Sequence, residues 1–370
     1  MALTQIKFAP GIDKQDTKVG AQGRWVDSDN VRFRYGLPEK VGGWASLINE
    51  TIVGVVRRQL PFVDAEGNRY VALGTDKFLL LYFEGQLFDI TPFRFDSNNA
   101  QEQFLTSSIT TTNTSTTITV TTKNGGAAVP HGLSVGDMVV FNNFAAGSSG
   151  IADADLEGKV VQVITVPSTT TFTATVPNAA SATSSDGTVD IQPYAVVGPA
   201  EQSYGYGFGI STYGGVVTGG SDTGWGVAVA ASTQTLEPGL WSLDTFGNVL
   251  IATIANGRTY TWDSNIAAKF TTRASVNTTN FLTTLNPVAS RLTLVSPTTQ
   301  HLIHFGTCTT YNDASTQDDM FIRFSNNEEI NSYDVKATNT AGTFRLQDGT
   351  KIMGALTAKE TILVWTDSSL

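Results

Sequence analysis

Short runs of β-branched and aromatic residues, each bounded by Gly, Asn, Asp or Pro, recur along the chain and constrain its fold more than any other feature. Clear examples are 52–56, 69–74, 78–83, 248–253 and 361–365. Runs of this kind predict β-strands, whereas apolar residues almost nowhere recur at the spacing of an amphipathic helix. The sequence therefore predicts an all-β fold.

Several of these runs form pairs that read as successive hairpins. The pairs span 70–81, 249–262, 290–304 and 351–365. The turn Asn256-Gly257 within the second pair is a strong two-residue hairpin signal. Diverged hairpins in series are typical of β-propeller blades, so we expect a propeller-like body.

The composition changes sharply between residues 104 and 194, where Thr, Ser, Ala and Val dominate and both Arg and Trp are missing. Several short strand signals in this segment predict a small β-sandwich or β-barrel. Hairpin-rich chain lies on both sides, which indicates a domain inserted at a loop of the host. The expected organisation is an extended N-terminal arm (1–44), a first part of the body (45–103), the inserted domain (104–194) and a second part of the body (195–370).

The residues that carry chemistry are few. Cys308 is the single cysteine, which excludes an intramolecular disulfide and suits an ordinary buried thiol. His301 and His304 are three apart on a predicted strand, so they point to opposite faces and cannot share a metal. The acidic residues between 313 and 329 do not have the spacing of a calcium loop, and no nucleophile elbow is present. We therefore expect no catalytic residue, metal or cofactor, and a protein that is not an enzyme.

The formal net charge of −10 argues against tight, sequence-independent binding of nucleic acid. An acidic surface would still let DNA slide past without sticking. No apolar stretch approaches the ~20 residues of a membrane span, and the first residues lack the layout of a signal peptide. We expect a soluble chain made in the cytoplasm.

Arginines gather near the start of the chain among aromatic residues. Such a cluster can bind nucleic acid by stacking and phosphate contacts, or the arginines can pair with Asp27, Asp29, Glu39 or the acids of a neighbouring subunit. The second interpretation is the favoured one. The candidate interface anchors are Arg24, Trp25, Arg32, Arg34, Trp44, Trp225 and Trp241.

The segment 23–44, GRWVDSDNVRFRYGLPEKVGGW, resembles the opening of the tail nozzle proteins of short-tailed bacteriophages, also called tail tubular or packaged-DNA stabilisation proteins. The stretches 224–226, 240–252, 323–325, 337–342 and 346–352 are similar to later parts of that family. The segment 131–137 resembles modules found inside phage tail proteins.

The resemblance implies a structural virion protein of the tail, made in the host cytoplasm and without catalysis. It implies a hexameric ring below the portal that retains the packaged genome and conducts it at ejection. The implied partners are further copies of the chain, the portal-proximal adaptor, tail fibre, spike or needle proteins, and viral DNA in transient contact. A chain of 370 residues is short for a closed propeller, so we expect either a truncated chain or completion by another segment or subunit.

Two other functions compete with this one. The first is a receptor- or glycan-binding tail module that uses the inserted domain, and the second is an enzymatic depolymerase. A glycan site should present exposed Trp or Tyr, and the segment 104–194 contains no Trp. This composition counts against a glycan site in the insert.

Overall fold

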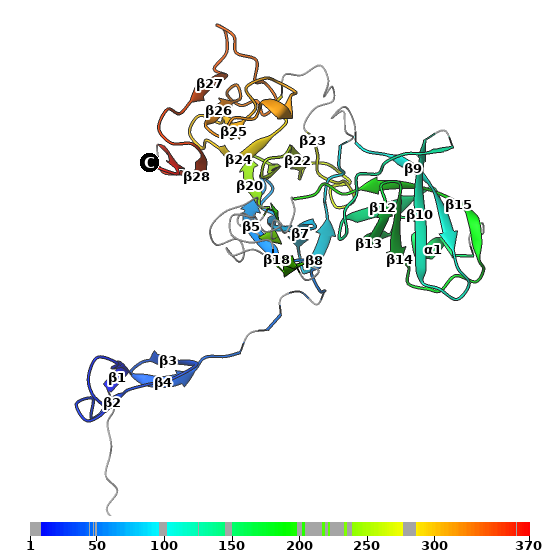
Figure 1. Ribbon diagram of the computed structural model, residues 1–370. Helices are drawn as coiled ribbons and strands as arrows, with labels where there is room; N and C mark the ends of the chain where they lie inside the picture. Colours follow the sequence, from blue (N-terminus) through cyan, green and yellow to red (C-terminus); the bar gives the residue numbers. More distant parts are fainter. Residues whose placement is uncertain are drawn as a thin grey trace, which may run out of the picture. The chain divides into compact units, whose positions relative to one another are not determined.

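The computed structural model describes residues 9–43, 45–46, 48, 50–95, 102–124, 126–144, 150–197, 202–203, 217–218, 221–222, 233–234, 239–276, 286–359 and 361–370. The chain divides into two compact units, Met1–Glu50 and Thr51–Leu370. Strands dominate both units, and the expectation of an all-β fold is confirmed (Figure 1).

The N-terminal unit, Met1–Glu50, is built from four short strands. Strands β1 (Ala9–Ile12) and β2 (Arg24–Trp25) pair in parallel, and β3 (Val31–Arg34) and β4 (Leu37–Lys40) form an antiparallel hairpin. The hairpin turns through Tyr35 and Gly36, whose φ angles of 50° and 80° are both left-handed. Two left-handed residues define the turn that matches the twist of paired strands, and glycine takes one of them without strain.

The segment between residues 104 and 194 folds as a closed β-barrel. The strands follow the order β10-β14-β13-β12-β15-β9 around the barrel, and β9 pairs with β10 to close it. The short strand β11 pairs with the end of β10. The strands are β9 (Leu105–Thr111), β10 (Thr117–Asn124), β11 (Ala127–Ala128), β12 (Met138–Asn142), β13 (Val160–Ser168), β14 (Thr171–Thr175) and β15 (Ser184–Pro193), with the short helix α1 (Asp153–Leu156). Phe141 and Phe172 are fully buried inside it. Of the two predicted architectures, the insert therefore adopts the barrel.

The remainder of the second unit contains four consecutive antiparallel sheets. Sheet 1 contains β5 (Val56–Val63), β6 (Arg69–Thr75), β7 (Leu79–Phe83) and β8 (Gln86–Asp89). Sheet 2 contains β20 (Trp241–Phe246), β21 (Val249–Ile254), β22 (Thr259–Asp263) and β23 (Ser275–Val276). Sheet 3 contains β24 (Ser290–Val295), β25 (Leu302–Thr307), β26 (Phe321–Phe324) and β27 (Gly342–Arg345), and sheet 4 contains β28 (Ile352–Thr357) and β29 (Ile362–Thr366). Two short pairs, β16 (Gln202–Ser203) with β19 (Thr233–Gln234) and β17 (Val217–Thr218) with β18 (Ser221–Asp222), and the 3-10 turn η1 (Ala314–Thr316) complete the described elements.

The first strands of successive sheets lie next to one another, in the order β5, β20, β24 and β28. Apolar clusters fill the spaces between the sheets: Tyr70 of sheet 1 packs with Trp262 of sheet 2, and Ile251 of sheet 2 packs with Val295 of sheet 3. Consecutive four-stranded meanders with adjacent first strands have the arrangement of propeller blades.

The barrel covers the other face of sheet 1, where Leu80 belongs to one apolar cluster with Val140 of β12. The chain enters and leaves the barrel at neighbouring points, because Phe93 forms a β-bridge with Tyr194 and the Ala195 N–H donates to the Pro92 carbonyl at 2.9 Å. None of the described helices is long and apolar enough to cross a membrane.

Candidate functional site

Two arginines of the N-terminal unit pair with acids of the same unit. Arg24 Nη1 lies 2.9 Å from Asp13 Oδ2, and Arg32 Nε lies 3.1 Å from Glu39 Oε2. The Arg32–Glu39 pair follows from the hairpin register, which places these residues directly opposite each other. Both arginine side chains remain more than half exposed, so each pair contributes at most about 1 kcal/mol and leaves the guanidinium accessible to a partner.

The hairpin of this unit also presents apolar side chains to solvent. Tyr35 is 92% exposed and Leu37 is 70% exposed, while the Arg34 guanidinium lies 5.4 Å from the centre of the Tyr35 ring. Among the described residues of the unit, Ala21 is the one buried apolar residue. Exposed aromatic and arginine side chains without a core of their own are typical of a surface that binds another protein.

The other predicted anchors have different outcomes. Trp25 is half-buried, whereas Trp44 and Trp225 lie outside the described residues. Trp241 is only 2% exposed, and its indole N–H donates to the Thr75 carbonyl at 2.9 Å. It therefore joins sheet 2 to sheet 1 inside the core and has no surface to offer another subunit, because its ring fills the space between the two sheets.

A cavity of about 840 Å³ lies where the first strands of the four sheets meet. Its lining includes Arg58 of β5, Asp244 of β20, Arg291 of β24 and Leu356 of β28. Burial raises the pKa of Asp244, although its carboxylate accepts a 2.7 Å hydrogen bond from the Val295 N–H. Asp244 thus joins sheet 2 to sheet 3, and Arg291 Nε joins sheet 3 to sheet 4 by donating to the Ile352 carbonyl at 3.1 Å. The sequence did not predict these contacts, because they depend on which strands become adjacent.

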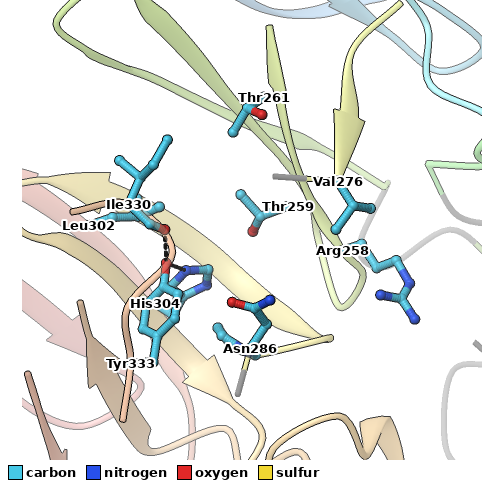
Figure 2. Close-up of a pocket in the computed structure, with 10 residues that line it drawn as sticks. Arg258, Thr259, Thr261, Val276, Asn286, Leu302, His304, Ile330 and Tyr333 are labelled. Atoms are coloured by element: carbon cyan, nitrogen blue, oxygen red, sulfur yellow. Dashed lines mark hydrogen bonds between the residues drawn. The ribbon is translucent and has the colours of Figure 1, made fainter. Parts of the chain in front are cut away.

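Sheet 3 contains a buried serine–histidine contact. Figure 2 shows the histidine, His304, with Tyr333 and other residues that line the adjoining cavity. His304 Nδ1 lies 2.8 Å from Ser290 Oγ, and its Nε2 lies 2.8 Å from the Tyr333 hydroxyl. The Tyr333 hydroxyl also donates to the Ile330 carbonyl at 2.9 Å, and the Ser290 hydroxyl donates to Thr307 Oγ1 at 3.1 Å, so the imidazole lies within one continuous hydrogen-bond network.

This contact lacks the access that nucleophilic catalysis requires. Ser290 and His304 are each 1% exposed, and the adjoining cavity measures about 30 Å³, enough for water but not for a substrate. Burial, and secondarily the charge of Arg323, lowers the pKa of His304 to about 3. The imidazole is therefore a neutral member of a core hydrogen-bond network. His301 lies directly before β25 and is only half-buried.

The acidic residues of 313–329 serve local structure. Asp313 accepts the Ser315 N–H at 3.0 Å and caps the η1 turn, and Asp318 pairs with Arg345 at 2.7 Å. Within the part of the chain that the structure describes, no group of three His, Cys, Asp or Glu side chains could hold a metal ion.

No family model matches the chain, and no curated protein matches it significantly. Among solved structures, the chain is similar to one described as "Phage phi92 endosialidase", with 14% sequence identity and a TM-score of 0.19. The similarity covers 80% of this chain and 47% of that one, so the chain spans about half of the neighbour's length. An overlap this weak carries no argument about fold or function.

Proposed function

We propose that this chain is a structural protein of a bacteriophage tail, forming a hexameric nozzle ring below the portal and adaptor. The ring retains the packaged genome and conducts it at ejection, without catalysis. Its partners are further copies of the chain, the adaptor, fibre, spike or needle proteins, and DNA in transient contact. The family resemblance of segment 23–44 supports this proposal.

One observation carries the proposal beyond resemblance: the segment with the family motif belongs to a compact unit of its own, Met1–Glu50. That unit exposes Tyr35, Leu37 and two arginines, which is the composition of a binding surface. An arm of this kind suits a ring subunit, because rotation about an axis closes head-to-tail contacts between identical chains.

The charge of the chain fits a conduit for DNA. A formal net charge of −10 repels phosphate and prevents the tight, nonspecific binding that would hold a moving genome. The body also has apolar clusters between successive sheets, which give the rigid wall that a nozzle needs.

Electron microscopy of the purified full chain tests the proposal. We expect six-fold rings with a central hole, and we expect a variant lacking residues 1–23 to lose them. Val135→Asp is a suitable control, because this exposed barrel residue lies far in sequence from the arm and should leave rings intact. Trimers would favour a receptor-binding module instead, and rings formed equally well by the deletion variant would show that residues 1–23 are not needed for assembly.

A further inference from the structure

The wall of the cavity beside His304 contains a buried amide without a protein partner. Asn286, just before β24, is 7% exposed, and among the described residues its Nδ2 group has no hydrogen-bond partner. Figure 2 shows this amide pointing toward the space between Thr259 and the His304 ring. Buried N–H groups in proteins are almost always paired, either with the protein or with ordered water. The orphan donor therefore indicates that the cavity holds a hydrogen-bond acceptor.

Two chains of hydrogen-bonded side chains end at the same cavity. On the side of sheet 2, Thr259 Oγ1 lies 2.8 Å from Thr253 Oγ1, which lies 2.7 Å from Thr293 Oγ1 of sheet 3. On the other side, His304 Nε2 of β25 lies 2.8 Å from the Tyr333 hydroxyl. Thr259 and Tyr333 both line the cavity, so one bound molecule can reach the ends of both chains.

The size of the cavity and the chemistry of its wall select water as that molecule. A volume of about 30 Å³ has room for water and for no larger ligand. Water accepts the Asn286 N–H and has two protons for the hydroxyl oxygens of Thr259 and Tyr333, each of which can accept two hydrogen bonds. A metal cation would face the N–H donor, and an anion has no proton to donate. The charge of Arg258, which also lines the cavity, lies 4.2 Å from the centre of the Phe95 ring.

We propose that this cavity binds a structural water molecule, which accepts from Asn286 Nδ2 and donates to Thr259 Oγ1 and to the Tyr333 hydroxyl. The water joins the threonine chain of sheet 2 to the network around His304, and it thereby extends the polar contacts between sheets 2 and 3. A buried water with about three hydrogen bonds to otherwise unpaired groups is a fixed part of a protein structure.

A crystal structure of the full chain, at a resolution that shows ordered water, gives the first test. We expect electron density for a water molecule within hydrogen-bond distance of Asn286 Nδ2. A map without this density, or an amide bonded to another protein group, would overturn the proposal. A chloride ion at this place, identified by its anomalous scattering, would overturn the assignment to water.

Magnetic relaxation dispersion of water counts long-lived internal water molecules in solution and gives the second test. Asn286→Leu keeps a similar side-chain volume but removes the donor, so this variant should lose one long-lived water relative to the native chain. Asn142→Leu is the matched control, because Asn142 Nδ2 already donates to Gln192 Oε1 at 3.1 Å, and it should keep the native count. An unchanged count in a folded Asn286→Leu variant would overturn the proposal, and the crystal structure of the native chain decides if the variant does not fold.

Discussion

Mild acid should destabilise this protein through one buried imidazole. The pKa of His304 is about 3 in the folded chain, against 6.5 for an unperturbed histidine. Because the folded-state value is the lower one, the unfolded chain takes up the proton first as the pH falls. The contribution of His304 to stability is therefore complete above about pH 6.5 and decreases toward about pH 3.

The size of the effect follows from the same two values. Each pH unit inside this window costs about 1.4 kcal/mol of unfolding free energy. Between about pH 7 and about pH 5 the unfolding free energy decreases by about 2 kcal/mol. The first half pH unit contributes little, because His304 of the unfolded chain is still mostly neutral above its pKa of 6.5. A loss of this size lowers the folded-to-unfolded ratio by about thirtyfold.

Urea unfolding of the native chain and of His304→Gln, each at the two pH values, measures this loss. Glutamine keeps a donor and an acceptor in the Ser290–Tyr333 network but does not titrate. The native chain should lose about 2 kcal/mol more than the variant over this interval. His301→Gln is the control, since that more exposed side chain contacts Thr340 Oγ1 at 3.1 Å, and it should behave like the native chain. Equal losses in the native chain and His304→Gln would refute the reasoning.

Three further predictions concern the core. Gly74→Ala should lower the free energy of unfolding in urea by about 1–3 kcal/mol through overpacking, because the new methyl group would lie 2.5 Å from the Trp241 indole. Gly354→Ala is the control and should leave stability unchanged, because no atom lies within 4 Å of its new methyl group. Arg273→Gln removes the 3.0 Å contact with Asp89 and should lower stability by about 1–2 kcal/mol, a modest loss because both side chains are about one-quarter exposed; an unchanged melting temperature would contradict it. The Cys308 thiol is fully buried, and burial raises its pKa. A thiol reagent should therefore label it at least about a hundredfold more slowly in the native chain than in urea. Equal labelling rates would contradict this prediction.

Local patterns predicted the hairpins because both strands and the turn lie within a few residues of each other. The turn at Asn256 is longer than the predicted two-residue one: Asn256 has a left-handed φ of 59°, but residues 255–258 connect β21 to β22. The Arg32–Glu39 pair could be predicted for the same reason, since a two-residue turn fixes which side chains face each other. The compositional change at 104–194 likewise indicated a separate set of strands.

Non-local pairing could not be predicted in this way. The closure of the barrel depends on β9 meeting both β10 and β15, and no local pattern encodes the second of these contacts. Trp241 was expected at an interface and lies in the core, because a tryptophan on a strand has the same sequence pattern in both places. Arg24 pairs with Asp13, a residue outside the set of expected partners, because strands β1 and β2 associate in parallel across a long loop.

The bridge between Phe93 and Tyr194 has a consequence for how chains of this type can diversify. Since the barrel starts and ends at one point of its host, a shorter loop or a different domain can take its place with a small change in chain entropy. The exchange is limited by Leu80, which would become solvated without Val140 against it. A replacement domain must therefore cover this face of sheet 1 with apolar residues of its own. The contact between Leu80 and the inserted domain, rather than the junction at Phe93 and Tyr194, thus limits which domains can be inserted there.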